Sequence, residues 1–121
     1  MNNVYIMSAN RSAIGGFGGM LKNFCPVDLG TLVAKEAITR SGYDAEEVEH
    51  AVFGNVIHTE PRDMYVSRVI ALQAGMSKES AALTVNRLCG SGLQAIVSAI
   101  QLLTLGDANI TMAGGVEIMS N

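Results

Sequence analysis

The chain has 121 residues, of which 49% are hydrophobic and 16% charged, and its formal net charge is −3. This composition is typical of a folded domain with a hydrophobic core and excludes a disordered chain. The basic residues are scattered along the sequence. A nucleic-acid-binding surface needs clustered Lys and Arg, so no nucleic-acid partner is expected.

The cellular setting follows from the first residues and the cysteines. The start, MNNVYIMSANR, has no basic segment followed by a long apolar run, so a secretory signal is not expected. Two cysteines, Cys25 and Cys89, make a disulfide framework improbable. We therefore expect a cytoplasmic protein.

Strand and helix patterns alternate along the chain. Strands are expected at residues 4–8, 51–57, 81–85 and 107–113, and helices at 28–40, 62–74 and 91–105. Asp28 is the expected N-cap of the first helix. This βαβαβαβ order predicts an α/β fold with a mostly parallel central sheet and helices on both faces. Ligand chemistry is then expected at the carboxyl ends of the strands.

The stretch from Leu88 to Gly106 has no charged residue and is long enough to span a bilayer. A polar residue nevertheless recurs at every third or fourth position, which puts one polar stripe along a helix: Ser91, Gln94, Ser98, Gln101 and Thr104. Because a lipid-facing helix has no use for such a stripe, we expect a buried helix of a soluble protein and no membrane partner.

Cys89 lies where the third expected strand turns into this uncharged helix. A thiol at a helix N-terminus feels the positive end of the helix dipole, which stabilises the thiolate. Free N–H groups at that end can also stabilise a developing oxyanion. Gly90 and Gly92 leave room for a bulky acyl thioester, and substitution Gly90→Val is expected to harm both folding and acylation. From spacing alone, a buried structural cysteine remains the alternative.

The segment from Thr84 to Leu93, TVNRLCGSGL, closely resembles the acyl-enzyme signature of thiolases. Three further segments match the same family in order: RSAIGGFGG at 11–19, GNV at 54–56, and GDA with AGGVEIMS between 106 and 120. The resemblance covers essentially the whole chain, which is identified as the N-terminal part of a thiolase, over residues 1–121.

The resemblance implies an acyl-CoA C-acyltransferase that forms or cleaves short 3-ketoacyl-CoA such as acetoacetyl-CoA. Cys89 is then the nucleophile that holds the acyl group as a thioester, and its backbone N–H contributes to an oxyanion hole. Gly90 and Ser91 are the expected substrate-binding residues. CoA enters as part of the substrate, and neither a metal nor another cofactor is expected. The implied partners are acyl-CoA and either further copies, as a homodimer or homotetramer, or a chain that supplies the C-terminal half.

Thiolases continue into a loop domain and a second, similarly folded half. The activating histidine, the second catalytic cysteine and most of the CoA pocket of the family lie in those parts. Cys25 matches no catalytic position of the family and is expected to be a small hydrophobic filler. His50 and His58 flank the second expected strand and are expected to be surface or strand-end residues. This chain alone is therefore expected to be inactive.

Two other functions remain open. One is a truncated, non-catalytic module that pairs with full-length thiolase subunits. The other is a thiol redox or acyl-acceptor protein that uses Cys89 alone.

Overall fold

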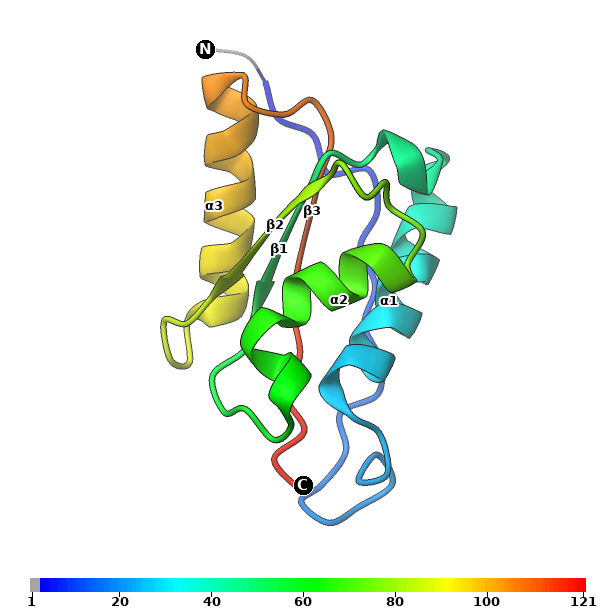
Figure 1. Cartoon of the computed structure of the whole chain (residues 1–121), viewed down its shortest axis with the longest axis vertical. Coiled ribbons are helices and arrows are strands. Elements are labelled where there is room, and N and C mark those ends of the chain that lie inside the picture. Colours follow the sequence, from blue (N-terminus) through cyan, green and yellow to red (C-terminus); the bar gives the residue numbers. More distant parts are fainter. Residues whose placement is uncertain (1–2) are drawn as a thin grey trace.

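A computed structural model describes residues 3–121, which form an α/β structure of a three-stranded sheet between two layers of helices (Figure 1). The elements in chain order are α1 (Pro26–Ser41), η1 (Ala45–Glu47), β1 (His50–Gly54), η2 (Pro61–Tyr65), α2 (Val66–Gln73), β2 (Ala81–Val85), α3 (Ser91–Leu105) and β3 (Thr111–Gly115). The predicted α/β class, with helices on both faces of the sheet, is confirmed.

The sheet has the strand order β2-β1-β3, and both pairings are parallel. Gly54, the last residue of β1, is level with Val85 of β2 and Gly115 of β3. All three strands therefore end at one edge, and the segments that follow them meet there. This is the edge at which parallel α/β sheets place their ligands.

Alternate residues of β1 supply the two faces of the core. Ala51 and Phe53 pack with the helices α1 and α2, in a cluster that includes Val27, Val66 and Ile70. Val52 points to the opposite face and packs with Ala95 and Ala99 of α3. The period of two residues is that of a central strand buried on both faces.

Residues 4–8, expected to be the first strand, form no strand in this structure, so that prediction is wrong for this chain. The segment lies along α1 instead: the Ser8 hydroxyl donates to the carbonyl of Ala37 at 2.7 Å, and the Asn10 amide donates to that of Val33 at 3.1 Å. The apolar side chains of Tyr5, Ile6 and Met7 are exposed. A strand needs a neighbouring edge to pair with, and among residues 3–121 no edge pairs with this segment.

Several element ends differ from the expected ones. α1 begins at Pro26 with Cys25, and not Asp28, as its N-cap, because proline suits the first helical position. The second expected helix starts as the 3₁₀ turn η2 before α2. β1 ends at Gly54 because the Glu117 carboxylate accepts the N–H groups of Val56 and Ile57. β3 begins only at Thr111, after a turn in which the Asn109 N–H donates to Glu49.

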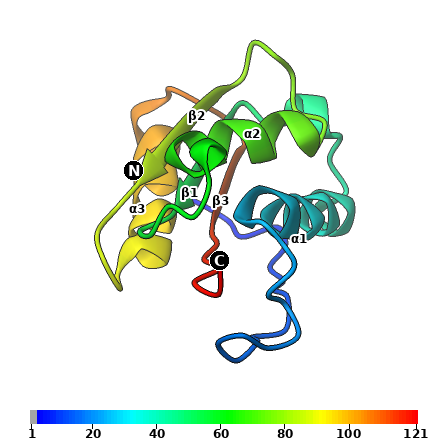
Figure 2. The ribbon, with the colours of Figure 1, turned by 60° about the horizontal axis from the view of Figure 1, so that its bottom comes forward.

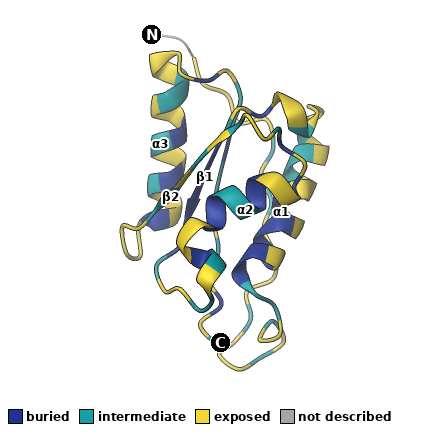
Figure 3. Cartoon of the chain, in the orientation of Figure 1, coloured by how far each residue is buried: buried dark blue, intermediate teal, exposed yellow. Residues whose placement is uncertain are grey.

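The limits of β2 and α3 agree with the sequence prediction. The expected burial of α3 does not, since only its sheet-facing side is covered, and Figure 3 shows exposed residues along the rest of the helix. The exposed apolar residues are Leu93, Ile96, Val97, Ile100 and Leu105. By length and composition the stretch Leu88–Leu105 could cross a membrane, a test that core helices of soluble proteins also pass.

Candidate active site

Cys89 lies in the loop that joins β2 to α3, at the carboxyl edge of the sheet (Figure 1). Figure 2 turns this edge toward the viewer. The loop between β2 and α3 lies at the left of this view, and the C-terminal residues lie near the centre of the same edge. The thiol is free and exposed. Two residues after Cys89, α3 begins with Ser91, so the thiol sits at the N-terminus of a 15-residue helix.

Glycines at the ends of two strands let this helix approach the sheet closely. A Cβ placed on Gly54 would lie 2.8 Å from Cβ of Ser91, and one placed on Gly115 would lie 3.6 Å from Cα of Gly92. The first turn of α3 therefore rests directly on the ends of β1 and β3. We call this contact of Gly54 and Gly115 with the first turn of α3 the glycine seat, and it fixes the position of Cys89 relative to the carboxyl edge.

The loop before the helix is held by its own polar groups. Oδ1 of Asn86 accepts the N–H of Leu88 at 3.0 Å. The Ser91 hydroxyl accepts the N–H of Arg87 at 2.8 Å and donates to the carbonyl of Leu88 at 2.7 Å. Ser91 is only 5% exposed, so the structure places this expected substrate-binding residue inside the loop.

Three backbone N–H groups around the thiol have different roles. Those of Gly90 and Ser91 donate to the carbonyls of Arg87 and Leu88, at 3.1 Å and 3.0 Å. No hydrogen bond is found from the N–H of Cys89 within residues 3–121. A backbone N–H without an acceptor is the kind of donor that an oxyanion hole uses.

Gly90 is exposed, and its backbone is ordinary for any residue, with φ −89°. A Cβ at this position would come no closer than 3.4 Å to its nearest neighbour, the carbonyl oxygen of Arg87. The space at Gly90 therefore accommodates a single Cβ, while the effect of the branched side chain in Gly90→Val stays a prediction. The absence of a side chain leaves space beside the thiol.

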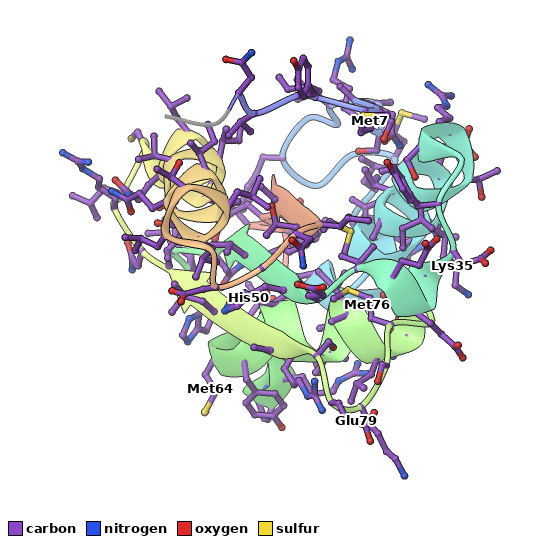
Figure 4. The ribbon with its side chains drawn as sticks, turned by 90° about the horizontal axis from the view of Figure 1, so that it is seen from above. Met7, Lys35, His50, Met64, Met76 and Glu79 are labelled. Atoms are coloured by element: carbon purple, nitrogen blue, oxygen red, sulfur yellow. The ribbon has the colours of Figure 1, made fainter. Side chains whose placement is uncertain are left out.

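His50 is not placed as a base for Cys89. His50 begins β1, at the amino ends of the strands, which Figure 4 views from above. About 13 Å of strand separates it from the carboxyl edge. His58 is exposed in the loop that follows β1. Within residues 3–121, no group of His, Cys, Asp or Glu side chains is arranged to hold a metal ion.

Cys25 lies away from this loop, at the start of α1. Its thiol donates to Oδ2 of Asp28 at 2.9 Å, and Nη2 of Arg62 donates to the sulfur at 3.5 Å. Burial, followed by the hydrogen bond to the Asp28 carboxylate, raises the pKa of the Cys25 thiol above its ordinary value. Cys25 is thus a partly buried thiol that resists ionisation.

The two cysteines are expected to differ in reactivity. At pH 7.5 iodoacetamide should alkylate Cys89 several-fold faster than Cys25, because the raised pKa of Cys25 leaves less thiolate at that pH and its sulfur is less accessible. Peptide mass spectrometry over time separates the two sites. In the variant Asp28→Asn, Cys25 should react faster while Cys89 keeps its rate. Faster alkylation of Cys25 than of Cys89 in the chain without substitutions would contradict this assignment.

One pair of site-edge residues was not anticipated from the sequence. Asn55 is fully buried, and its amide donates to the carbonyl of Val116 at 2.9 Å. The Glu117 carboxylate accepts the N–H of Ile57 at 2.6 Å and that of Val56 at 3.1 Å. The pair ties the segment after β1 to the segment after β3 beneath the first turn of α3. Both residues lie in the matched segments GNV and AGGVEIMS, which were the available signal.

Comparison with known proteins gives a consistent result. The family described as "Thiolase, N-terminal domain" matches residues 4–121. Beta-ketothiolase BktB of Cupriavidus necator is 56% identical over 117 residues, which are 97% of this chain and 30% of that protein. Human mitochondrial 3-ketoacyl-CoA thiolase is 38% identical over 120 residues, which are 99% of this chain and 30% of that protein.

The solved structures agree. A crystal structure of the human mitochondrial enzyme in complex with CoA matches with a TM-score of 0.93 and 38% identity, over 96% of this chain and 29% of the other. Acetyl-CoA acetyltransferase of Bacillus anthracis matches with a TM-score of 0.90 and 41% identity, over 96% and 29% of the two chains. The chain spans about 30% of the length of these relatives. It belongs to the thiolase family and corresponds to the N-terminal domain of that family.

Proposed function

We propose that Cys89 is the acyl-accepting nucleophile of an acyl-CoA C-acyltransferase that forms or cleaves short 3-ketoacyl-CoA such as acetoacetyl-CoA. The observation that carries the proposal is the exposed thiol at the N-terminus of α3, with a free N–H on the same residue, within the motif NRLCGSG. The chain acts in this reaction together with the remaining part of a thiolase, about 70% of the length of its relatives.

In the synthetic direction, the Cys89 thiolate attacks the carbonyl carbon of an acyl-CoA. A bond from Sγ to the acyl carbon forms and the bond from that carbon to the CoA sulfur breaks. CoA leaves as a thiol by taking up the proton that the Cys89 thiol gave up when it ionised. The α-carbon of a second acyl-CoA, after losing a proton, then attacks the thioester and expels the Cys89 thiolate. Thiolysis runs these steps backwards. Covalent catalysis divides one difficult step into two easier ones.

The described residues supply part of this chemistry. The helix N-terminus favours the thiolate by about 0.3–1 kcal/mol, which is less than the roughly 1.4 kcal/mol needed for a tenfold change in ionisation. The Cys89 N–H suits the oxyanion of the thioester carbonyl. His50 lies at the opposite end of the strands, and we expect the base that deprotonates the second substrate to come from the remaining part of a thiolase, outside residues 3–121. This is why we expect the chain alone to be inactive.

The test is a chimera in which this chain replaces the matching 117 residues of the Cupriavidus necator relative, chosen because of its 56% identity. We expect the chimera to cleave acetoacetyl-CoA in the presence of CoA, and the 121-residue chain alone to show no turnover. Consumption of acetoacetyl-CoA measures activity, and intact-mass spectrometry after incubation with acetyl-CoA detects the acyl adduct. The unmodified relative is the matched control.

The outcomes separate clearly. An acetyl adduct on Cys89 in the active chimera supports the proposal. A chimera that folds and assembles like the relative but neither accepts an acetyl group nor cleaves acetoacetyl-CoA would overturn it.

A second candidate rests on the apolar side of α3, where Leu93, Ile96 and Ile100 are exposed. Such a face is unusual for an isolated domain and suits a surface that another polypeptide covers. A non-catalytic chain that pairs with full-length subunits would use it without chemistry at Cys89. An inactive chimera, combined with binding of the chain to the intact relative, would favour this function.

A further inference from the structure

Leu88, the residue before the candidate nucleophile, has a backbone conformation that leucine avoids. Its φ is +50°, and among residues 3–121 the other positions with positive φ are glycines: Gly18, Gly42, Gly75 and Gly106. An L-residue populates the left-handed conformation about 5–30 times less than the right-handed one. The Leu88 side chain is 69% exposed, so packing does not hold it there.

Hydrogen bonds hold it instead. The N–H of Leu88 donates to Oδ1 of Asn86 at 3.0 Å. The carbonyl of Leu88 accepts both the hydroxyl of Ser91 at 2.7 Å and the N–H of Ser91 at 3.0 Å. Ser91 cannot easily shift, because it is almost fully buried against the glycine seat at Gly54.

The carbonyl of Leu88 and the N–H of Cys89 belong to the same peptide group. A trans peptide is planar, and its C=O and N–H point in opposite directions. The structure contains no cis peptide bond among its described residues. By turning the Leu88 carbonyl into the loop, Ser91 therefore turns the Cys89 N–H away from it, toward the space beside the thiol.

We infer that Ser91 is a positioning residue, assisted by Asn86, that orients the Cys89 N–H as an oxyanion donor by stabilising the left-handed Leu88. This inference rests on the proposed function and replaces the expected role of Ser91 as a substrate contact. The hydroxyl of Ser91 is engaged by Arg87 and Leu88, so it acts on the substrate only through the Leu88–Cys89 peptide.

The test uses a rescue in the active chimera. Ser91→Ala should lower kcat for acetoacetyl-CoA cleavage by about tenfold or more with little change in KM. The upper limit is the roughly 10²–10³-fold loss of kcat that follows complete removal of one oxyanion-hole donor. Adding Leu88→Gly to Ser91→Ala should recover several-fold of the loss, because glycine adopts positive φ readily. Adding Leu88→Ala should recover nothing, because alanine shares the conformational preference of leucine.

A second readout does not need acyl transfer. In the NMR spectrum of the 121-residue chain, a residue with positive φ gives a strong cross-peak between its own amide and α protons. Leu88 should show this signal in the unmodified chain and lose it in Ser91→Ala. If the proposed function fails, the chimera with unmodified Ser91 is inactive while this NMR comparison still decides the inference.

Two results would overturn the inference. One is a loss of activity in Ser91→Ala that Leu88→Gly does not relieve and that appears mainly in KM, as a direct substrate contact predicts. The other is an unchanged positive-φ signal of Leu88 in Ser91→Ala. Circular dichroism confirms beforehand that each variant is folded.

Discussion

Substitution Cys89→Ser is expected to lower acyl transfer by the chimera at least about a thousandfold. The thiolate is the reactive form of cysteine, whereas a serine hydroxyl is a weak nucleophile unless a base activates it. Cleavage of acetoacetyl-CoA measures the loss, and intact-mass spectrometry should show that the acetyl adduct disappears.

The fold should be indifferent to this change. Cys89 is exposed, and replacing its sulfur by oxygen leaves no cavity, so the free energy of unfolding should change by less than about 0.5 kcal/mol. Cys25→Ser is the matched control, a thiol of the same chain away from the loop, and should retain turnover. Full activity of Cys89→Ser would remove Cys89 from the reaction.

Substitution Gly54→Ala is expected to have the largest effect on stability, a loss of about 3 kcal/mol in the free energy of unfolding. Its new Cβ would lie 2.8 Å from Cβ and 2.9 Å from the carbonyl carbon of Ser91. Backbone atoms cannot rotate away as a side-chain end can, so the first turn of α3 must move off the sheet. Urea unfolding followed by circular dichroism measures the change.

Gly92→Ala is the control for this substitution. A Cβ on Gly92 meets nothing within 4 Å, and the position is in the first turn of α3. Alanine there should leave stability unchanged or raise it by about 0.5–1 kcal/mol, because glycine is a poor helix former. Equal unfolding midpoints for Gly54→Ala and the unmodified chain would show that α3 does not rest on β1 as described.

Local patterns predicted some elements to the residue and others poorly. The strand Ala81–Val85 is bounded by turn residues, and the helix Ser91–Leu105 has Gly92 near its start and Gly106 at its end. The limits of these two elements are therefore determined by residues next to them in the sequence. β1 and β3 were misplaced at their ends because distant carboxylates, Glu117 and Glu49, take up backbone N–H groups there.

The segment 4–8 is a case in which the local pattern predicted the wrong structure. Its residues have strand character, but a strand exists only where another strand accepts its hydrogen bonds, and that depends on contacts distant in sequence. In this structure the segment is tied to α1 through Ser8 and Asn10. A local sequence pattern indicates which secondary structure a segment prefers, but it does not indicate which other segment it will pair with.

The sequence by itself determined the α/β class, the family and the place of Cys89 at the start of a helix, because periodicity, turn residues and a contiguous motif are all local properties. Only the tertiary structure decided that α3 rests on Gly54 and Gly115, and that Leu88 is left-handed. It also decided that the Ser91 hydroxyl points into the loop. Leucine carries no signal for a positive φ, and a serine does not reveal which group it will bond. Both depend on close contacts that form when the first turn of α3 meets the ends of the strands.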